Sequence, residues 1–167
     1  MTMRIFLYGE DVLRQKSSPV EEVDDDVRAL IRNMAETMRQ AGGIGLAAPQ
    51  VGESRRIIIA EVPQERQGLV ALVNPKIIEP AGSSDFEEGC LSIPGISAKV
   101  KRAAEVVVEG TTPEGKAITK RYSGLLARVM QHEIDHLEGI LFVDRLGILG
   151  RSALSLKLRK LAKANSK

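Results

Sequence analysis

Short β-branched runs are concentrated in one stretch of this 167-residue chain, residues 55–123, and helical periodicity lies on either side of it. Val, Ile and Thr favour strands, and turns rich in Gly and Pro separate the runs. The predicted strands are 57–62, 69–73, 76–79, 86–92, 97–103, 105–109 and 116–122, with a hairpin turn at 113–116. Because the strands follow one another without intervening helices, we expect an α+β fold built on antiparallel sheets.

Three segments show the apolar spacing of helices. The first, 25–41, begins after an acidic N-cap, the second, 125–137, is apolar enough to be central, and the third, 152–164, is amphipathic. Residues 43–52 contain too many glycines for a continuous helix or strand and are predicted to form a shaped loop. The expected architecture is antiparallel β-sheets packed around a central helix, with an N-terminal and a C-terminal helix.

Chain length, aromatic content and cysteine content indicate the number of domains and the expected compartment, and they disfavour some kinds of binding protein. A chain of 167 residues supports one hydrophobic core, so we expect a single domain over 1–167, of which 152–167 form a basic C-terminal helix. Only 3% of the residues are aromatic and none is Trp, which disfavours a base-stacking nucleic-acid platform. Cys90 is the only cysteine, and the apolar stretch 5–8 is too short for a signal sequence or a membrane span. We therefore expect a cytoplasmic protein without membrane association.

Both histidines of the chain lie on the predicted central helix, in the sequence Gln-His-Glu-Ile-Asp-His at 131–136. A separation of four residues places His132 and His136 on the same helix face about one turn apart, with Glu133 beside them. This spacing is typical of two metal ligands and a general base, which makes the central helix a candidate metal-binding helix. The alternative is that both histidines are core residues that satisfy hydrogen bonds.

A catalytic metal needs a third protein ligand and an open coordination position. A third histidine at the extended metzincin spacing would fall on Phe142, and no glutamate follows Glu138, where Asp144 is the only later acid. Cys90 remains as the third ligand, and Gly89 before it lets the backbone approach a metal or a substrate. Taken alone, a free cysteine is more often a small buried hydrophobe.

Three motifs resemble, in order and spacing, the signature motifs of peptide deformylases. They are Gly-Ile-Gly-Leu-Ala-Ala-Pro-Gln at 43–50, Glu-Gly-Cys-Leu-Ser at 88–92 and Gln-His-Glu-Ile-Asp-His at 131–136. All three are complete, and they extend from the end of the first helix to the central helix. The resemblance implies a metal-dependent hydrolase of a linear amide, which removes the N-formyl group from the N-terminal formylmethionine of new polypeptides and releases formate.

The resemblance also implies how the metal site works. One divalent ion held by Cys90, His132 and His136 activates a water molecule, and Glu133 accepts its proton and later protonates the leaving amine. The family points to Fe(II) as the physiological ion, and the same ligands accommodate Zn(II), Ni(II) or Co(II).

Other residues receive roles by similarity to the family. The side-chain amide of Gln50 and the backbone N–H of Leu91 are expected to stabilise the oxyanion. The backbone of Ile44 and Gly45 is expected to bind an extended peptide by strand addition, with Gly89 as a further substrate contact. The expected pocket for the methionine side chain is formed by Ile44, Phe86, Leu125 and Val129. Each of these four side chains is equally compatible with ordinary core packing.

The expected partners are nascent formylmethionyl peptides, and we expect a monomer. Seven basic residues and no acid follow residue 144, so the C-terminal helix could dock on the ribosome or could be a solvated helix face. Three other functions stay open: a general metallopeptidase, a non-catalytic structural or sensing metal protein, and a ribosome-binding module without activity. The lack of a fourth His or Cys ligand and the presence of Glu133 favour hydrolysis.

Overall fold

The computed structural model describes residues 1–166, and Lys167, the last residue of the predicted basic segment, lies outside the described residues. Its helices and strands are α1 (Asp25–Gln40), β1 (Gly45–Ala47), β2 (Ile57–Ala60), β3 (Val70–Ala81), β4 (Ser84–Cys90), β5 (Ile93–Arg102), β6 (Glu105–Thr111), β7 (Ala117–Ser123), α2 (Gly124–Leu137) and α3 (Ile148–Asn165). Short 3₁₀ helices occur at Asp11–Arg14, Ala48–Val51 and Phe142–Arg145. The strands form a five-stranded antiparallel sheet in the order β1-β2-β3-β6-β7 and a separate antiparallel pair, β4-β5.

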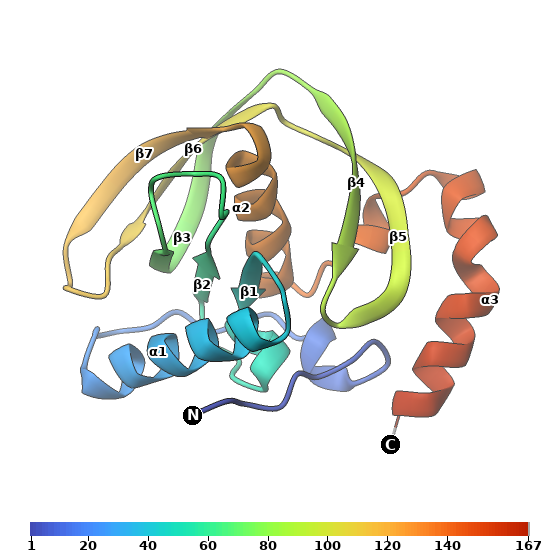
Figure 1. Cartoon of the computed structure of the whole chain (residues 1–167), viewed down its shortest axis with the longest axis horizontal. Helices are drawn as coiled ribbons and strands as arrows, with labels where there is room; N and C mark the ends of the chain where they lie inside the picture. The colour runs from blue at the N-terminus through green and yellow to red at the C-terminus, as the bar shows by residue number, and fades with distance from the viewer. Residues whose placement is uncertain (167) are drawn as a thin grey trace.

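The helix α2 lies between the two sheets, with α1 against the five-stranded sheet and α3 outside the β4–β5 pair (Figure 1). The strand β2 packs against a helix on each of its two faces. Its Ile57 and Ile59 belong to the hydrophobic cluster with α1, whereas Ile58 and Ala60 belong to the cluster with α2. Both faces of β2 are buried, which explains its uninterrupted apolar sequence. The predicted α+β architecture around a central helix is confirmed.

The ends of the first two helices follow from local chemistry. The Asp24 carboxylate accepts a hydrogen bond from the Val27 backbone N–H at 3.0 Å, which caps α1 as predicted. After α2 the chain turns at Gly139, whose φ is +73°. A Cβ atom at this position would lie 2.6 Å from the backbone oxygen of Arg14. The close approach of the two backbones therefore requires glycine.

The strands predicted at 69–73 and 76–79 are parts of one strand, β3. Asn74 has a φ of +52°, and the register with β6 shifts between Val73 and Lys76. The Asn74 side chain also makes two hydrogen bonds of 2.8 Å with the backbone of Val20. The polar break in the apolar pattern is therefore a bulge and not a turn between strands.

Other predictions of local structure are also wrong, among them the strand predicted over 86–92, which is β4 and ends at Cys90. Residues 43–52 contain the strand β1 and a 3₁₀ helix as well as a loop, because the glycines shorten the strand without preventing its pairing with β2. The strand β5 begins at Ile93, since a register shift between Gly89 and Cys90 accommodates its early Pro and Gly. The helix α3 begins at Ile148, and its first two residues are 90% and 87% exposed, so no apolar spacing marks this turn. No helix in the described part of the chain is long and apolar enough to cross a membrane.

Candidate metal centre

Two elements bring the predicted metal ligands together. His132 and His136 lie on α2 with ring centroids 5.1 Å apart, and Cys90 ends β4. The Cys90 Sγ atom is 3.4 Å from His136 Nε2, and one donor atom from each of the three residues lies within 4.8 Å of the others. One thiolate and two imidazoles suit a first-row divalent metal and leave a coordination position open. These residues therefore fit a catalytic metal ion.

The electrostatics of the site favour a cation. Burial lowers the pKa of His136 well below its usual value, so its imidazole is neutral and able to bind a metal. Burial acts in the same direction on His132, but the carboxylate of Glu133 and hydrogen bonds with Cys90 and Glu88 raise the pKa of His132 well above 6.5. The groups that stabilise a proton on His132 would equally stabilise a metal ion.

Glu133 lies beside the ligands and is almost fully buried. Its side chain is buried, and its Oε1 atom has no hydrogen-bond partner among the described residues. Burial raises the pKa of Glu133 to about 7, although His132 and Arg102 act in the opposite direction. A Cβ atom on Gly45 would overlap Glu133 Oε2, so the glycine makes room for this carboxyl group. A carboxyl group with a pKa near neutrality can both accept and donate a proton.

Gln50 points its amide at the same site from the 3₁₀ helix Ala48–Val51. Its Oε1 atom accepts a hydrogen bond from the Ala47 N–H at 2.9 Å, and its Nε2 atom donates to Ser92 Oγ at 3.1 Å and to Cys90 Sγ at 3.5 Å. The side chain is 1% exposed. Leu91 follows Cys90 directly, in the turn between β4 and β5. The structure thus places both predicted oxyanion-stabilising residues next to a predicted metal ligand.

A cavity of about 490 Å³ opens over these groups. Its walls come from the segment 42–45, from β4 and the turn after it, and from α2. The predicted site residues that line it are Ile44, Gly45, Gln50, Phe86, Gly89, Cys90, Leu91, Leu125, Val129, His132 and Glu133. His136 is the one predicted site residue outside this lining, and it is 1% exposed beneath it. Phe86 and Leu125 stay exposed, by 56% and 36%, so neither is an ordinary core residue.

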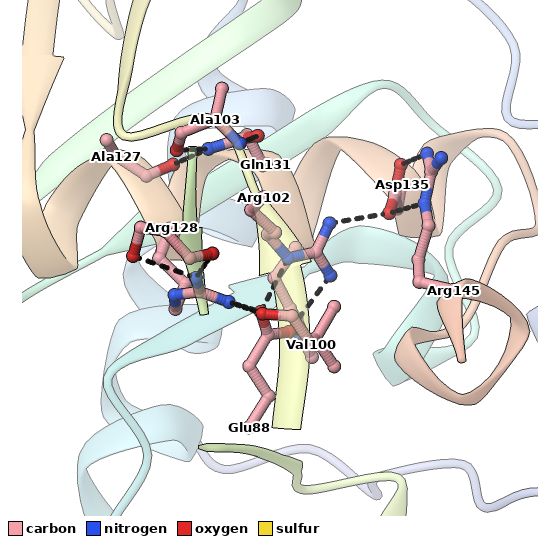
Figure 2. A network of polar contacts seen from close by, with 11 residues as sticks. Glu88, Val100, Arg102, Ala103, Ala127, Arg128, Gln131, Asp135 and Arg145 are labelled. Carbon is pink, nitrogen blue, oxygen red and sulfur yellow. Dashed lines mark hydrogen bonds and ion pairs between the residues drawn. The ribbon is translucent and has the colours of Figure 1, made fainter. Parts of the chain in front are cut away.

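A buried ionic network behind the ligands was not predicted (Figure 2). Glu88 Oε1 contacts His132 Nδ1 at 2.9 Å, and the same carboxylate accepts hydrogen bonds from Arg102 and Arg128. Arg102 also donates to Asp135, 2.9 Å away. Burial raises the pKa of Glu88, but the hydrogen bonds with His132 and Arg102 outweigh it and hold the pKa at about 2. The carboxylate therefore stays ionised and fixes the orientation of the His132 ring.

Two residues of this network, Glu88 and Arg128, have a sequence spacing that places them on the same face as a metal ligand. Glu88 lies two residues before Cys90 on one strand, so both side chains point to the same face. Arg128 lies four residues before His132 and shares its helix face. The position of Arg102 opposite Ser84 depends on strand register, which no local pattern specified.

The family model for polypeptide deformylase matches residues 2–151. The peptide deformylase of Halothermothrix orenii is 51% identical over 152 residues, which cover 91% of this chain and 98% of that protein. The peptide deformylase of Thermodesulfovibrio yellowstonii is 45% identical over 159 residues, covering 94% of this chain and 96% of that protein.

Solved structures agree with the sequence comparison. A crystal structure of a peptide deformylase from Legionella pneumophila superposes with a TM-score of 0.89 at 40% identity, covering 98% of this chain and 97% of that one. The peptide deformylase of Thermus thermophilus gives a TM-score of 0.91 at 40% identity, covering 98% and 99%. With the Cys90, His132 and His136 cluster in place, the chain belongs to the polypeptide deformylase family, the metal-dependent hydrolases that remove the N-formyl group from nascent peptides.

Proposed function

We propose that Cys90, His132 and His136 hold one divalent cation, with Fe(II) as the physiological ion and Zn(II), Ni(II) or Co(II) as ions that the site also accepts. The observation that carries this proposal is the convergence of the three donor atoms within 4.8 Å beside the cavity. The resemblance to peptide deformylases supports iron. When bound, such a cation supplies Lewis acidity, which polarises a carbonyl oxygen and lowers the pKa of a coordinated water.

Glu133 is the proton-transfer group of this proposal. It accepts a proton as water attacks the formyl carbon, and it delivers that proton to the nitrogen as the C–N bond breaks. The products are formate and a peptide with a free amino group. The buried position of Glu133 and its pKa of about 7 support both transfers by one carboxyl group.

Gln50 and Leu91 stabilise the negative charge that develops on the formyl oxygen. The Gln50 amide is held by Ala47 and Ser92, so its direction is set before substrate arrives. Leu91 contributes its backbone N–H from the turn that follows Cys90. Removing one such donor typically costs about 3 to 4 kcal/mol of transition-state stabilisation, so Gln50→Ala should fold but turn over very slowly.

The remaining cavity residues bind the peptide. The backbone of Ile44 and Gly45 lies beside the cavity and offers hydrogen-bonding groups to an extended chain, with Gly89 on the facing wall. The methionine side chain enters the apolar part of the cavity, formed by Ile44, Phe86, Leu125 and Val129.

Formate release from a formyl-Met tripeptide by anaerobically prepared protein tests these assignments. Glu133→Gln should lose activity while it retains about one metal ion per chain. Glu138→Gln is a matched control, because Glu138 lies at the end of the same helix and pairs with Arg56 at 3.4 Å, outside the cavity. Absence of formate from metal-loaded wild type would reject the proposed site, and activity in Glu133→Gln would reject Glu133 as the proton-transfer group.

We also propose that α3 docks on the ribosome, where a monomer of the cytoplasmic enzyme meets its substrate. The helix packs on the body through the buried Leu158, and its basic side chains stay exposed. Lys157→Glu, Lys160→Glu and Lys163→Glu together should reduce co-sedimentation with ribosomes without affecting a tripeptide substrate. The matched control is Lys76→Glu, Lys116→Glu and Lys120→Glu, at exposed positions on the large sheet and in the turn before β7. Equal ribosome binding by both triple variants would reject the docking role.

A further inference from the structure

The side chain of Arg128 joins α2 to both strands of the β4–β5 pair (Figure 2). Its Nη1 atom donates to Glu88 Oε2 at 2.5 Å and to the Val100 backbone oxygen at 2.8 Å. Its Nη2 atom donates to the Ser84 backbone oxygen at 2.7 Å and to Ser84 Oγ at 3.2 Å. In the described part of the chain the β4–β5 pair shares no strand pairing with the five-stranded sheet. Side-chain contacts such as these, together with the short connections to β3 and β6, therefore set its position on α2.

Arg128 also faces the cavity. It lines the cavity together with its helix neighbours Leu125 and Val129. Its guanidinium carbon lies 5.9 Å from the ring centroid of Phe86, the exposed aromatic residue of β4. Arg128 thus contacts both β4, which forms one wall of the cavity, and the Phe86 ring on that strand.

The metal ligand His132 is oriented by Glu88, and Arg102 holds Glu88 in place independently of Arg128. Glu88 accepts hydrogen bonds from Arg102 Nε at 2.6 Å and Arg102 Nη2 at 2.9 Å, besides the bond from Arg128. Without Arg128 the Glu88 carboxylate would keep a cationic partner and its contact with His132. Arg128, and not Arg102, donates to the backbone oxygens of Ser84 in β4 and Val100 in β5.

We propose that Arg128 is a positioning residue for substrate, which fixes the distance between β4 and α2 and so sets the width of the pocket for the first side chain of the peptide. This rests on the proposed binding of methionine in the cavity. Loss of the guanidinium would let β4 and Phe86 move away from α2. Binding and side-chain selectivity would then fall, while metal content and the chemical step would change little.

The test measures kcat and KM for formyl-Met and formyl-Ala tripeptides, with metal content, on wild type and Arg128→Met. We expect KM for the formyl-Met peptide to rise about tenfold, as for the loss of one charge-assisted hydrogen bond, with a smaller preference for Met over Ala. Arg102→Met should instead lower metal content. Arg121→Met is the matched control, because Arg121 is exposed on β7, and it should match wild type. Wild-type activity in the same assay decides the proposed function separately.

Wild-type KM and selectivity in metal-loaded Arg128→Met would overturn the proposal. The proposal would also be overturned if Arg128→Met lost metal while its metal-loaded molecules kept the wild-type KM. Arg128 would then act on the metal site through Glu88. Arg128→Lys provides a milder variant, since an ammonium group can pair with Glu88 but cannot bridge Ser84 and Val100 in the same way. An intermediate KM in this variant supports the proposal. If neither variant folds, Arg128 is purely structural and the proposal is wrong.

Discussion

Ser92 accepts a hydrogen bond from the side-chain amide of Gln50 at 3.1 Å, and it is fully buried within the turn between β4 and β5. We expect Ser92→Ala to lower kcat about fivefold with KM unchanged, because the amide loses one of the bonds that orient it, worth about 1 kcal/mol. Steady-state kinetics on a formyl-Met tripeptide provides the measurement. In a Gln50→Ala background the same substitution should have no further effect, and additive losses would show that Ser92 acts elsewhere.

Gly45→Ala should misplace Glu133. The added methyl group would overlap Glu133 Oε2 and would lie 2.6 Å from Val129 Cγ1, so both side chains must move. We expect activity to fall about 100-fold with metal retained, the loss typical of a displaced catalytic group. Gly147→Ala is the control, because no atom beyond its chain neighbours lies within 4 Å of a Cβ there. Full activity in Gly45→Ala would mean that Glu133 can relocate without cost.

Glu88→Gln should weaken metal binding. The substitution removes the charge that orients His132 through its Nδ1 atom, and such changes behind a ligand typically cost about 10- to 100-fold in metal affinity. Competition with a chelator measures the affinity. Glu87→Gln, one residue away with an exposed side chain, should retain the wild-type affinity. Equal affinity in the two variants would contradict the orienting role of Glu88.

Asp144 should contribute to stability in a pH-dependent way. Burial raises its pKa, but hydrogen bonds from Arg14, the Leu141 N–H and Arg151 outweigh this and hold the pKa below 3.8. The contribution is therefore fully present above about pH 4 and is lost as the pH falls through the lower folded value. Urea unfolding should show Asp144→Asn destabilised by about 1 kcal/mol at pH 7, because two of the partners are partly exposed. The difference should shrink at pH 3, and a constant difference would refute the linkage.

The parts of the fold that could be predicted are those with strong local patterns. The acidic cap of α1, the turn at Gly139 and the four-residue spacing of the histidines each determine structure within a few residues. The bulge at Asn74 could not be predicted, because its hydrogen bonds with Val20 join distant segments. The start of α3 was missed because its exposed first turn buries nothing.

The site divides in the same way. Cys90 could be assigned because it was the only suitable ligand left, not because any local pattern placed it beside α2. Arg102 could not be assigned, since its position depends on strand register, and the helix face that Arg128 shares with His132 does not indicate its partners on the β4–β5 pair. The network they form is a property of tertiary structure, because its partners lie on separate elements of the chain.

Within residues 1–166 the strand β4 has a hydrogen-bonded neighbour on one side only, and in the proposed function its Gly89 contacts the substrate peptide. An open strand edge is a hazard for a protein, because two copies can pair through it and begin to aggregate. Here the strand carries the exposed acids Asp85 and Glu87, opposite Lys101 and Lys99 of β5, and charged side chains at a strand edge disfavour pairing with a second copy. The open edge of β4 can therefore stay accessible to a substrate peptide while two copies of the protein avoid pairing through it.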